Sequence, residues 1–228
     1  RYLAYPLGIL QPTIGDGDKI ATDGKTFTVG AKALLERVAE DGIKGAERTL
    51  LHVLLHVLFL HPFRIRKPAK IYDIACDVAV SFVLDGEDGV RTAGYKYRKE
   101  VYDAIKRKYG AVGESQAFGY LVSVGEEERK RISLLFKVCD HSLWYGRNLP
   151  DDEDEKSGNS ANIAAPDEND YDGRDEAGEA TWIEILRGAL SDLGKSDEVR
   201  KSLVKVLSGK RDYKRFFDKF LSSSERVK

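Results

Sequence analysis

The chain contains no methionine in its 228 residues, not even at position 1. Either the sequence begins inside a longer protein, or methionines are missing from it as written. Missing residues would distort long spacings more than short ones. Short motifs therefore carry more weight than distances between remote residues.

Cysteine is also scarce, with only Cys76 and Cys139 present. Two cysteines make no disulfide framework, so a reducing cytoplasm is the simplest setting. The longest apolar run, Leu50–Leu60, is interrupted by histidines. It is far shorter than the roughly 20 residues of a membrane-spanning helix. We therefore expect a cytoplasmic location and no membrane partner.

An excess of either charge is lacking as well, because the formal net charge is −1. No global field attracts nucleic acid or an anionic membrane. Glycine-rich phosphate loops, C-x-x-C pairs and nucleophile elbows are absent from the sequence. A composition that is 42% hydrophobic and 33% charged indicates a soluble chain with a real core.

The apolar spacing predicts a mainly α fold (α+β) with a small β-hairpin. Residues 1–19 are expected to form an irregular lead-in, and the hairpin is expected at Lys19–Val29, around the pair Asp23-Gly24. "AKALLERVAEDG" has helical spacing and ends at Gly42. Further helices are expected over residues 46–60, 71–84, 91–109 and 126–145.

The composition changes abruptly near Pro150. Between Pro150 and Ala180 there are twelve acidic residues and two basic ones, with very few large apolar side chains. Residues 151–178 therefore predict an acidic flexible loop or linker that follows a first domain, 1–150. Residues 179–228 contain three helical patterns, "TWIEILRGALSDLG", "SDEVRKSLVKVLSG" and "RDYKRFFDKFLSSS", which we expect to pack on that domain.

Three of the chain's four histidines stand in "LLHVLLHVLFLHPF", residues 50–63. His52 and His56 are four residues apart, so one face of a helix presents both imidazoles to the same ion. Asp73 and Asp77 repeat this spacing on the next expected helix. Carboxylates are almost never buried unless they are paired or bind a metal, so these four residues form a candidate zinc site.

The other two histidines are harder to place. An unbroken helix would turn His61 roughly 140° away from His56, so it joins the site only if the helix ends near Leu60. His141 lies in "CDHSLWY", where it is either a ligand or a buried histidine bonded to Asp140 or to a carbonyl. Two histidines at this spacing also arise by chance in the core of a protein, so metal binding and plain burial both remain open.

The runs "IATDGKTF", "LLHVLLHVLFLHPF" and "YDIACDVAVSFVLDG", with "DHSLWY" and "RDYKRFFDKF", resemble a metallopeptidase-like domain of bacterial proteins. That domain precedes a von Willebrand factor A-like domain. The resemblance implies a zincin-like helical core over residues 46–85 and a zinc ion at His52, His56 and Asp77. Asp73 is then a second carboxylate ligand or the group that orients a histidine. It also implies that the chain is the N-terminal portion of a longer protein.

The match fails at one position. Family members carry H-E-x-x-H, and the glutamate is Val53 here. That glutamate is the general base that takes a proton from zinc-bound water, a task valine cannot perform. We therefore expect a catalytically impaired domain that acts as a binding or regulatory module and that either keeps or lacks zinc. An active zinc peptidase with a substitute base is less favoured.

Two other functions compete with this one. In the first, the histidine helix is a core element of a metal-free scaffold, and protein partners bind elsewhere. In the second, nucleic acid binds residues 91–109, where seven Lys and Arg residues alternate with tyrosines. The near-neutral net charge disfavours nucleic acid. Protein partners, including the A-like domain of the same protein, are the favoured expectation.

Overall fold

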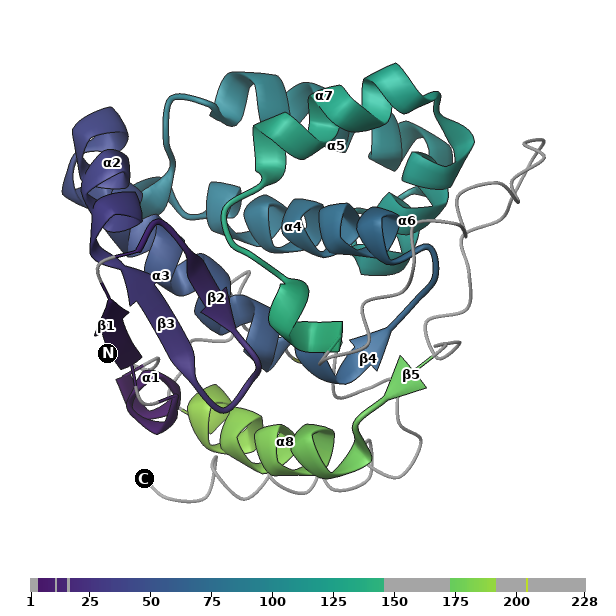
Figure 1. Ribbon diagram of the computed structural model, residues 1–228. Coiled ribbons are helices and arrows are strands. Elements are labelled where there is room, and N and C mark those ends of the chain that lie inside the picture. The colour runs from purple at the N-terminus through teal and green to yellow at the C-terminus, as the bar shows by residue number, and fades with distance from the viewer. Residues whose placement is uncertain (1–3, 11, 16, 146–172, 192–203, 205–228) are drawn as a thin grey trace, which may run out of the picture.

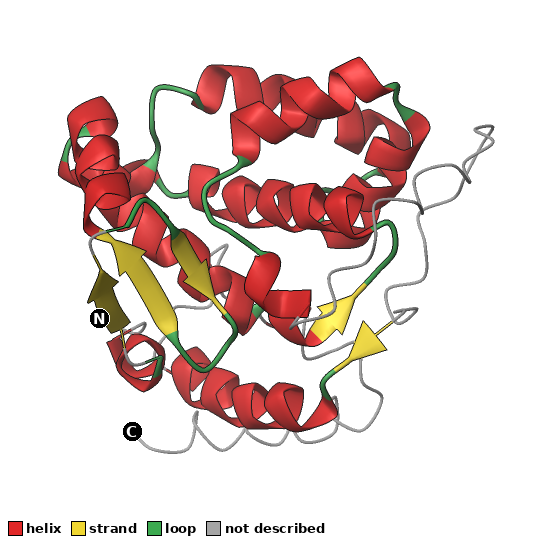
Figure 2. Cartoon of the chain, viewed as in Figure 1, coloured by secondary structure: helices red, strands yellow, loops and turns green. Residues whose placement is uncertain are grey.

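The structure is a computed structural model that describes residues 4–10, 12–15, 17–145, 173–191 and 204. Strands are short and lie mostly near the N-terminus, and helices dominate the rest (Figure 1, Figure 2). The expected mainly helical fold with a small sheet is confirmed for these residues. No helix among them is long and apolar enough to cross a membrane.

The sheet contains β1 (Pro12–Gly15), β2 (Ile20–Thr22) and β3 (Phe27–Gly30) in the order β1-β3-β2. β2 and β3 pair antiparallel and form the expected hairpin. Its turn is held by Asp23, whose side-chain oxygen accepts two backbone N–H bonds at 2.8 and 2.7 Å. Gly24 takes a φ of 85°, a left-handed value that favours glycine.

The expectation of an irregular lead-in over residues 1–19 is wrong where the structure describes it. Helix α1 (Ala4–Ile9) is followed by β1, which pairs with β3 in parallel. Strand β1 has three exposed residues and little apolar alternation of its own. It is a strand because β3 supplies hydrogen bonds from a later part of the chain.

Helices α2 (Ala31–Asp41) and α3 (Ile43–Leu58) follow the predicted pattern. Gly42 separates them with a φ of 69°. Helix α3 ends two residues before Leu60, the residue at which the sequence predicted its end, and Leu60 is itself left-handed at φ 67°. The chain then turns back through the 3-10 helix η1 (His61–Phe63), in which proline prevents continuation of the helix.

Helix α4 (Ala69–Gly86) is the central helix of the second half, and it packs against α3, α6 and α7 (Figure 1). It begins directly after Pro68 and is buried over most of its length. The elements around it are β4 (Arg64–Ile65), η2 (Asp88–Val90), α5 (Tyr95–Tyr109), α6 (Glu114–Ser123) and α7 (Glu126–Phe136). Helix α6 was not predicted, because its apolar residues are separated by small ones.

Two apolar clusters form the core, and α3 and α4 meet between them. The first cluster includes Phe27, Leu55 and Phe63, and joins the sheet to α3. The second includes Tyr72 and Val101, and joins α4 to α5, α6 and α7. Residues that face both clusters along the α3–α4 contact are therefore removed from solvent.

The single helix expected over residues 126–145 is wrong in its second half. Helix α7 ends at Phe136, and the following segment crosses to the sheet. There the backbone N–H of Asp140 donates to the carbonyl of Ile20 at 2.7 Å. A short 3-10 helix, η3 (Ser142–Tyr145), follows. The hydrogen bond to β2 thus fixes this segment at the edge of the sheet, and helix α7 does not continue.

At the C-terminal side, β5 (Gly173–Arg174) pairs antiparallel with β4 and leads into α8 (Glu176–Ser191). Helix α8 contains the first of the three predicted helical patterns. Most of the predicted acidic loop, 151–178, lies outside the described residues, and its last six residues form β5 and the start of α8. The other two patterns also lie outside the described residues, apart from residue 204.

Candidate metal centre

All four histidines of the chain lie in one buried group, although they come from three separate segments. The ring of His56 is central, with its centroid 4.6 Å from His52, 5.1 Å from His61 and 4.8 Å from His141. None of the four is more than 6% exposed. Imidazoles that are this close together and this deeply buried must share protons or a cation with their neighbours.

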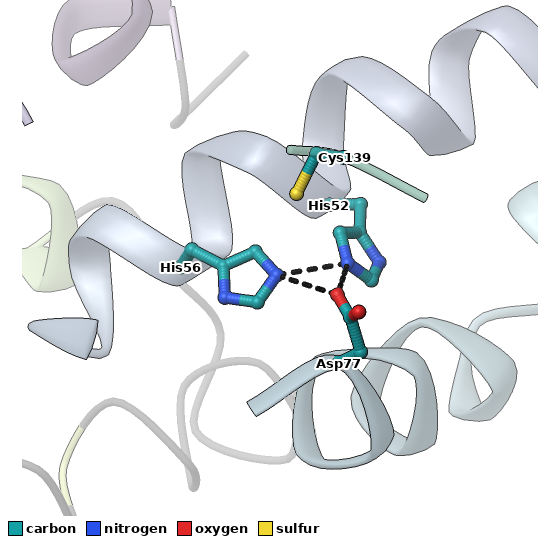
Figure 3. Close-up of side chains that lie close together, drawn as sticks. All are labelled: His52, His56, Asp77 and Cys139. Carbon is teal, nitrogen blue, oxygen red and sulfur yellow. Dashed lines mark hydrogen bonds and ion pairs between the residues drawn. The ribbon is translucent and has the colours of Figure 1, made fainter. Parts of the chain in front are cut away.

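Helix α3 brings the first two histidines together. Their four-residue spacing turns the side chain by about 40°, so both rings leave the same face of the helix. The Nε2 atoms of His52 and His56 are 2.8 Å apart and point toward α4 (Figure 3). The apolar residues on either side of them pack into the first cluster and hold the helix in place.

Helix α4 supplies the carboxylate that these rings face. Oδ1 of Asp77 lies 2.8 Å from Nε2 of His52 and 3.2 Å from Nε2 of His56 (Figure 3). Asp77 is 4% exposed, so its charge must be compensated by neighbours inside the protein. Three of the four site residues predicted from the sequence are therefore brought to one point.

Cys139 completes a set of four metal-ligating groups and was missed by the sequence reasoning. One ligand atom from each of His52, His56, Asp77 and Cys139 lies within 4.8 Å of all the others. The thiol reaches the site because the segment after α7 crosses to β2, and Figure 3 shows Cys139 beside His52, His56 and Asp77. The motif "CDH" carries a thiol and an imidazole two residues apart, both of which bind zinc, and this is a signal that would have nominated it.

Asp73, the fourth predicted residue, does not belong to this set. It lies one turn earlier on α4, where it hydrogen-bonds the hydroxyl of Tyr145. Its Oδ1 is 3.6 Å from Nδ1 of His141. Of the two roles predicted for Asp73, this position fits the orientation of a histidine.

His61 also lies outside the set of four donors, on the far side of the His56 ring. Because α3 ends before Leu60, the chain folds back, and Nδ1 of His61 comes within 2.9 Å of Nδ1 of His56. If Nε2 of His56 binds an ion, its Nδ1 carries the proton and donates it to His61. Partners of this kind set the tautomer and orientation of a metal-binding ring.

The spacing of the donors is close to that around a zinc ion. Ligand distances of about 2.1 Å in a tetrahedron place neighbouring nitrogen and oxygen atoms roughly 3.4 Å apart. The three separations among His52, His56 and Asp77 are 2.8, 2.8 and 3.2 Å. An outward shift of a few tenths of an ångström would fit an ion, and the same separations also suit direct hydrogen bonds.

Opposite charges stabilise one another in the site. Burial opposes charge on His52 and on His141, but their anionic neighbours Asp77 and Cys139 outweigh it and raise both pKa values. Burial disfavours a thiolate at Cys139, but contact with His141 outweighs it and lowers the pKa of the thiol. Positive charge on these two rings and negative charge on the thiol thus favour one another.

The remaining two histidines stay neutral. Burial, reinforced by the neighbouring cationic rings, lowers the pKa of His56 and of His61 well below its usual value. Imidazole, carboxylate and thiol groups bind divalent ions in their deprotonated forms, so the donor chemistry fits a divalent metal.

The site lacks the glutamate base of H-E-x-x-H. Val53, at the position of the general base in H-E-x-x-H, is fully buried in the first apolar cluster. All four donors are at most 6% exposed. A catalytic zinc keeps one position for water or substrate, whereas four protein ligands close the coordination sphere. The four donors could therefore hold an ion.

Comparison with family models, with curated proteins and with solved structures found no match for this chain. No family is shown. The resemblance to the metallopeptidase-like domain remains a prediction, and the function is argued from the geometry of the site.

Proposed function

We propose that this chain is a metal-binding domain that holds one divalent ion, preferably zinc, without peptidase activity. The convergence of four donor atoms within 4.8 Å in a buried site is the observation that carries this proposal. Two imidazoles, a carboxylate and a thiolate are ligands that zinc accepts in tetrahedral geometry. The ion ties α3, α4 and the segment at Cys139 together.

The predicted family supports a regulatory role for such a domain. A zincin-like pair of helices that keeps its histidines and aspartate but carries Val53 in place of the base retains the binding half of the chemistry. We propose that the metal stabilises a module that binds protein partners, including a von Willebrand factor A-like domain of the same protein. A thiolate ligand requires a reducing setting, in accord with a cytoplasmic location.

One alternative is favoured by a specific observation. The separations in the site also suit hydrogen bonds, so a metal-free interaction module is the second candidate. In that case the charges of His52, His141, Asp77 and Cys139 compensate one another without an ion.

Metal content separates the two candidates. Protein purified without added metal or chelator should contain about one zinc per chain by elemental mass spectrometry. The cobalt-substituted protein should show a sulfur-to-cobalt charge-transfer band from Cys139. Peptide substrates should not be cleaved.

The two cysteines offer a matched pair of variants. Cys139→Ala should abolish the charge-transfer band and lower the affinity for zinc. Cys76→Ala should leave both unchanged, because Cys76 is equally buried, precedes Asp77 on α4 and is not one of the four donors. If the wild-type protein binds neither zinc nor cobalt, the metal-free module is the correct assignment.

A further inference from the structure

A fifth donor points into the metal centre. Nε2 of His141 lies 3.0 Å from Sγ of Cys139 and 3.4 Å from Oδ1 of Asp77. Three imidazole Nε2 atoms, those of His52, His56 and His141, therefore surround one carboxylate oxygen. His141 is only 6% exposed, so its ring competes with no solvent for this position.

The ring of His141 is held in place by Trp144. It stacks on the indole of Trp144, with ring centroids 4.0 Å apart and an interplanar angle of 20°. That indole is fixed in turn, because its Nε1 donates to the carbonyl of Thr22 at 3.0 Å. The orientation of the imidazole is thus determined by the sheet and does not depend on an ion.

The outer nitrogen of the ring faces a carboxylate. Nδ1 of His141 is 3.6 Å from Oδ1 of Asp73, an ion-pair distance longer than a hydrogen bond, and the same oxygen accepts a hydrogen bond from Tyr145. A carboxylate behind a histidine whose other nitrogen points at a metal is the usual arrangement of zinc-binding histidines. Because Asp73 lies next to Nδ1, Nε2 of His141 is the nitrogen that faces the metal site.

The two inner distances agree with coordination. Bonds of about 2.1 Å to nitrogen and 2.3 Å to sulfur at a right angle place those atoms roughly 3.1 Å apart. Nitrogen and oxygen ligands at a tetrahedral angle lie roughly 3.4 Å apart. The observed 3.0 and 3.4 Å match these values, and they place His141 beside Cys139 and Asp77, outside the group of four donors whose atoms all lie within 4.8 Å of one another.

We propose that His141 is a fifth ligand of the metal through Nε2 and that Asp73 is its positioning residue. This inference rests on the proposed metal-binding function. Five protein ligands saturate the ion, so no position remains for water or substrate. The site then favours divalent ions that accept five mixed nitrogen, oxygen and sulfur ligands, such as zinc or cobalt, and it excludes hydrolysis by coordination as well as by the absence of a base.

Cobalt spectroscopy on the full chain tests the fifth ligand. The wild-type protein should show a charge-transfer band from Cys139 and the weak visible bands of a five-coordinate ion, and added imidazole should not change them. His141→Phe keeps a ring against Trp144 but removes the donor. It should keep the charge-transfer band, change the visible bands, and recover the wild-type spectrum when imidazole is added.

Asp73→Asn tests the positioning role. Cobalt should remain five-coordinate in this variant, while the affinity for the ion falls by about 10- to 100-fold. The thermal stability of the metal-free protein should change little, which separates positioning from a structural role. An unchanged affinity would overturn this part of the proposal.

NMR of the wild-type protein needs no variant and covers the case in which His141→Phe fails to fold. With an NMR-active cadmium isotope and labelled histidine, couplings should link cadmium to Nε2 of His52, His56 and His141. Couplings to His52 and His56 alone, or identical cobalt spectra for wild type and His141→Phe, would overturn the fifth ligand and leave the metal site standing. Failure of the wild-type protein to bind cobalt would overturn both.

Discussion

Val53 occupies the position at which H-E-x-x-H peptidases carry their general base, and its side chain is fully buried. Its neighbours are apolar residues of the first cluster, so the position opens on no cleft. A general base typically contributes 10²–10⁴-fold to a rate, but only where it reaches a reacting water. At position 53 neither the residue nor its apolar surroundings supply a general base.

Val53→Glu should therefore destabilise the fold without creating activity. A buried, unpaired carboxylate should lower the free energy of unfolding at neutral pH by more than about 3 kcal/mol. Val53→Gln introduces a similar volume without charge and should cost less. Denaturant unfolding measures both, and a peptidase assay checks activity.

The pH dependence of this pair isolates the charge. Burial raises the pKa of the new glutamate in the folded state above its unfolded value of about 4.3. Its charge therefore penalises folding at neutral pH, and the penalty disappears as pH falls below the unfolded value. Val53→Glu should then approach Val53→Gln in stability. Peptide cleavage by Val53→Glu would show that the site is open after all.

Helix α4 carries acidic residues with different roles at its two ends. Near its start are Asp73 and Asp77, which face the histidines. Near its end Asp85 is 3% exposed and binds two arginines from other helices. Arg98 donates to both carboxylate oxygens at 2.7 Å, and Arg48 approaches Oδ1 at 2.8 Å. This ionic cluster joins α3, α4 and α5. Arg48 and Arg98 therefore have a structural role.

Asp85→Asn should lower the free energy of unfolding by about 3–5 kcal/mol, because two buried guanidinium groups lose their counter-charge. Denaturant unfolding provides the measurement. Asp103→Asn is the matched control, since Asp103 forms an exposed ion pair with Lys99 and should change stability little. Equal effects of the two substitutions would show that the buried cluster stabilises the fold no more than an exposed ion pair does.

The contribution of Asp85 also depends on pH. Burial opposes its charge, but the bonds to Arg98 and Arg48 outweigh burial and lower the pKa of the carboxyl below its ordinary value. This stabilisation is therefore complete above an unfolded pKa of about 3.9 and is lost as pH falls through the lower folded value. The difference between wild type and Asp85→Asn should shrink only in strong acid.

In the molecule as a whole, α8 comes late in the chain and contacts the N-terminal hairpin and β4. The indole Nε1 of Trp182 donates to the carbonyl of Gly24 in the hairpin turn at 2.6 Å. Glu179, which is fully buried, pairs with Arg64 of β4 at 2.8 Å. Helix α8 also packs against α1 and α3. Helix α8 is thus part of the domain that contains the site.

Limited proteolysis should begin between residues 151 and 172, as the acidic and apolar-poor composition of that segment predicts. The two fragments should remain associated in gel filtration under native conditions, because α8 is anchored at both the hairpin and β4. Trp182→Ala should let them separate at lower denaturant concentrations. First cleavage within α3, or fragments of the wild-type protein that separate at once, would contradict this organisation.

Several elements could be predicted because their causes are local. Asp23-Gly24 is sufficient for a tight turn, and the apolar spacing of α2, α3 and α4 repeats within a few residues. The paired spacings also placed His52, His56 and Asp77 on facing helices. Gly42 ends α2 and Pro62 prevents α3 from continuing, because both act on the backbone directly, although α3 spans residues 43–58 where the sequence predicted 46–60.

The sequence by itself thus determined the hairpin, helices α2, α3 and α4 and three of the four donors in the candidate site, whereas α1, α6 and the end of α7 were missed. Only the tertiary structure decided that Cys139 and His141 reach this site and that Asp73 stands behind His141. The reason is that these positions depend on a hydrogen bond between Asp140 and the distant strand β2, which ends a pattern that would otherwise continue as helix. Local spacing carries no information about such a partner, so the fifth donor and its support emerge only when the sheet is assembled.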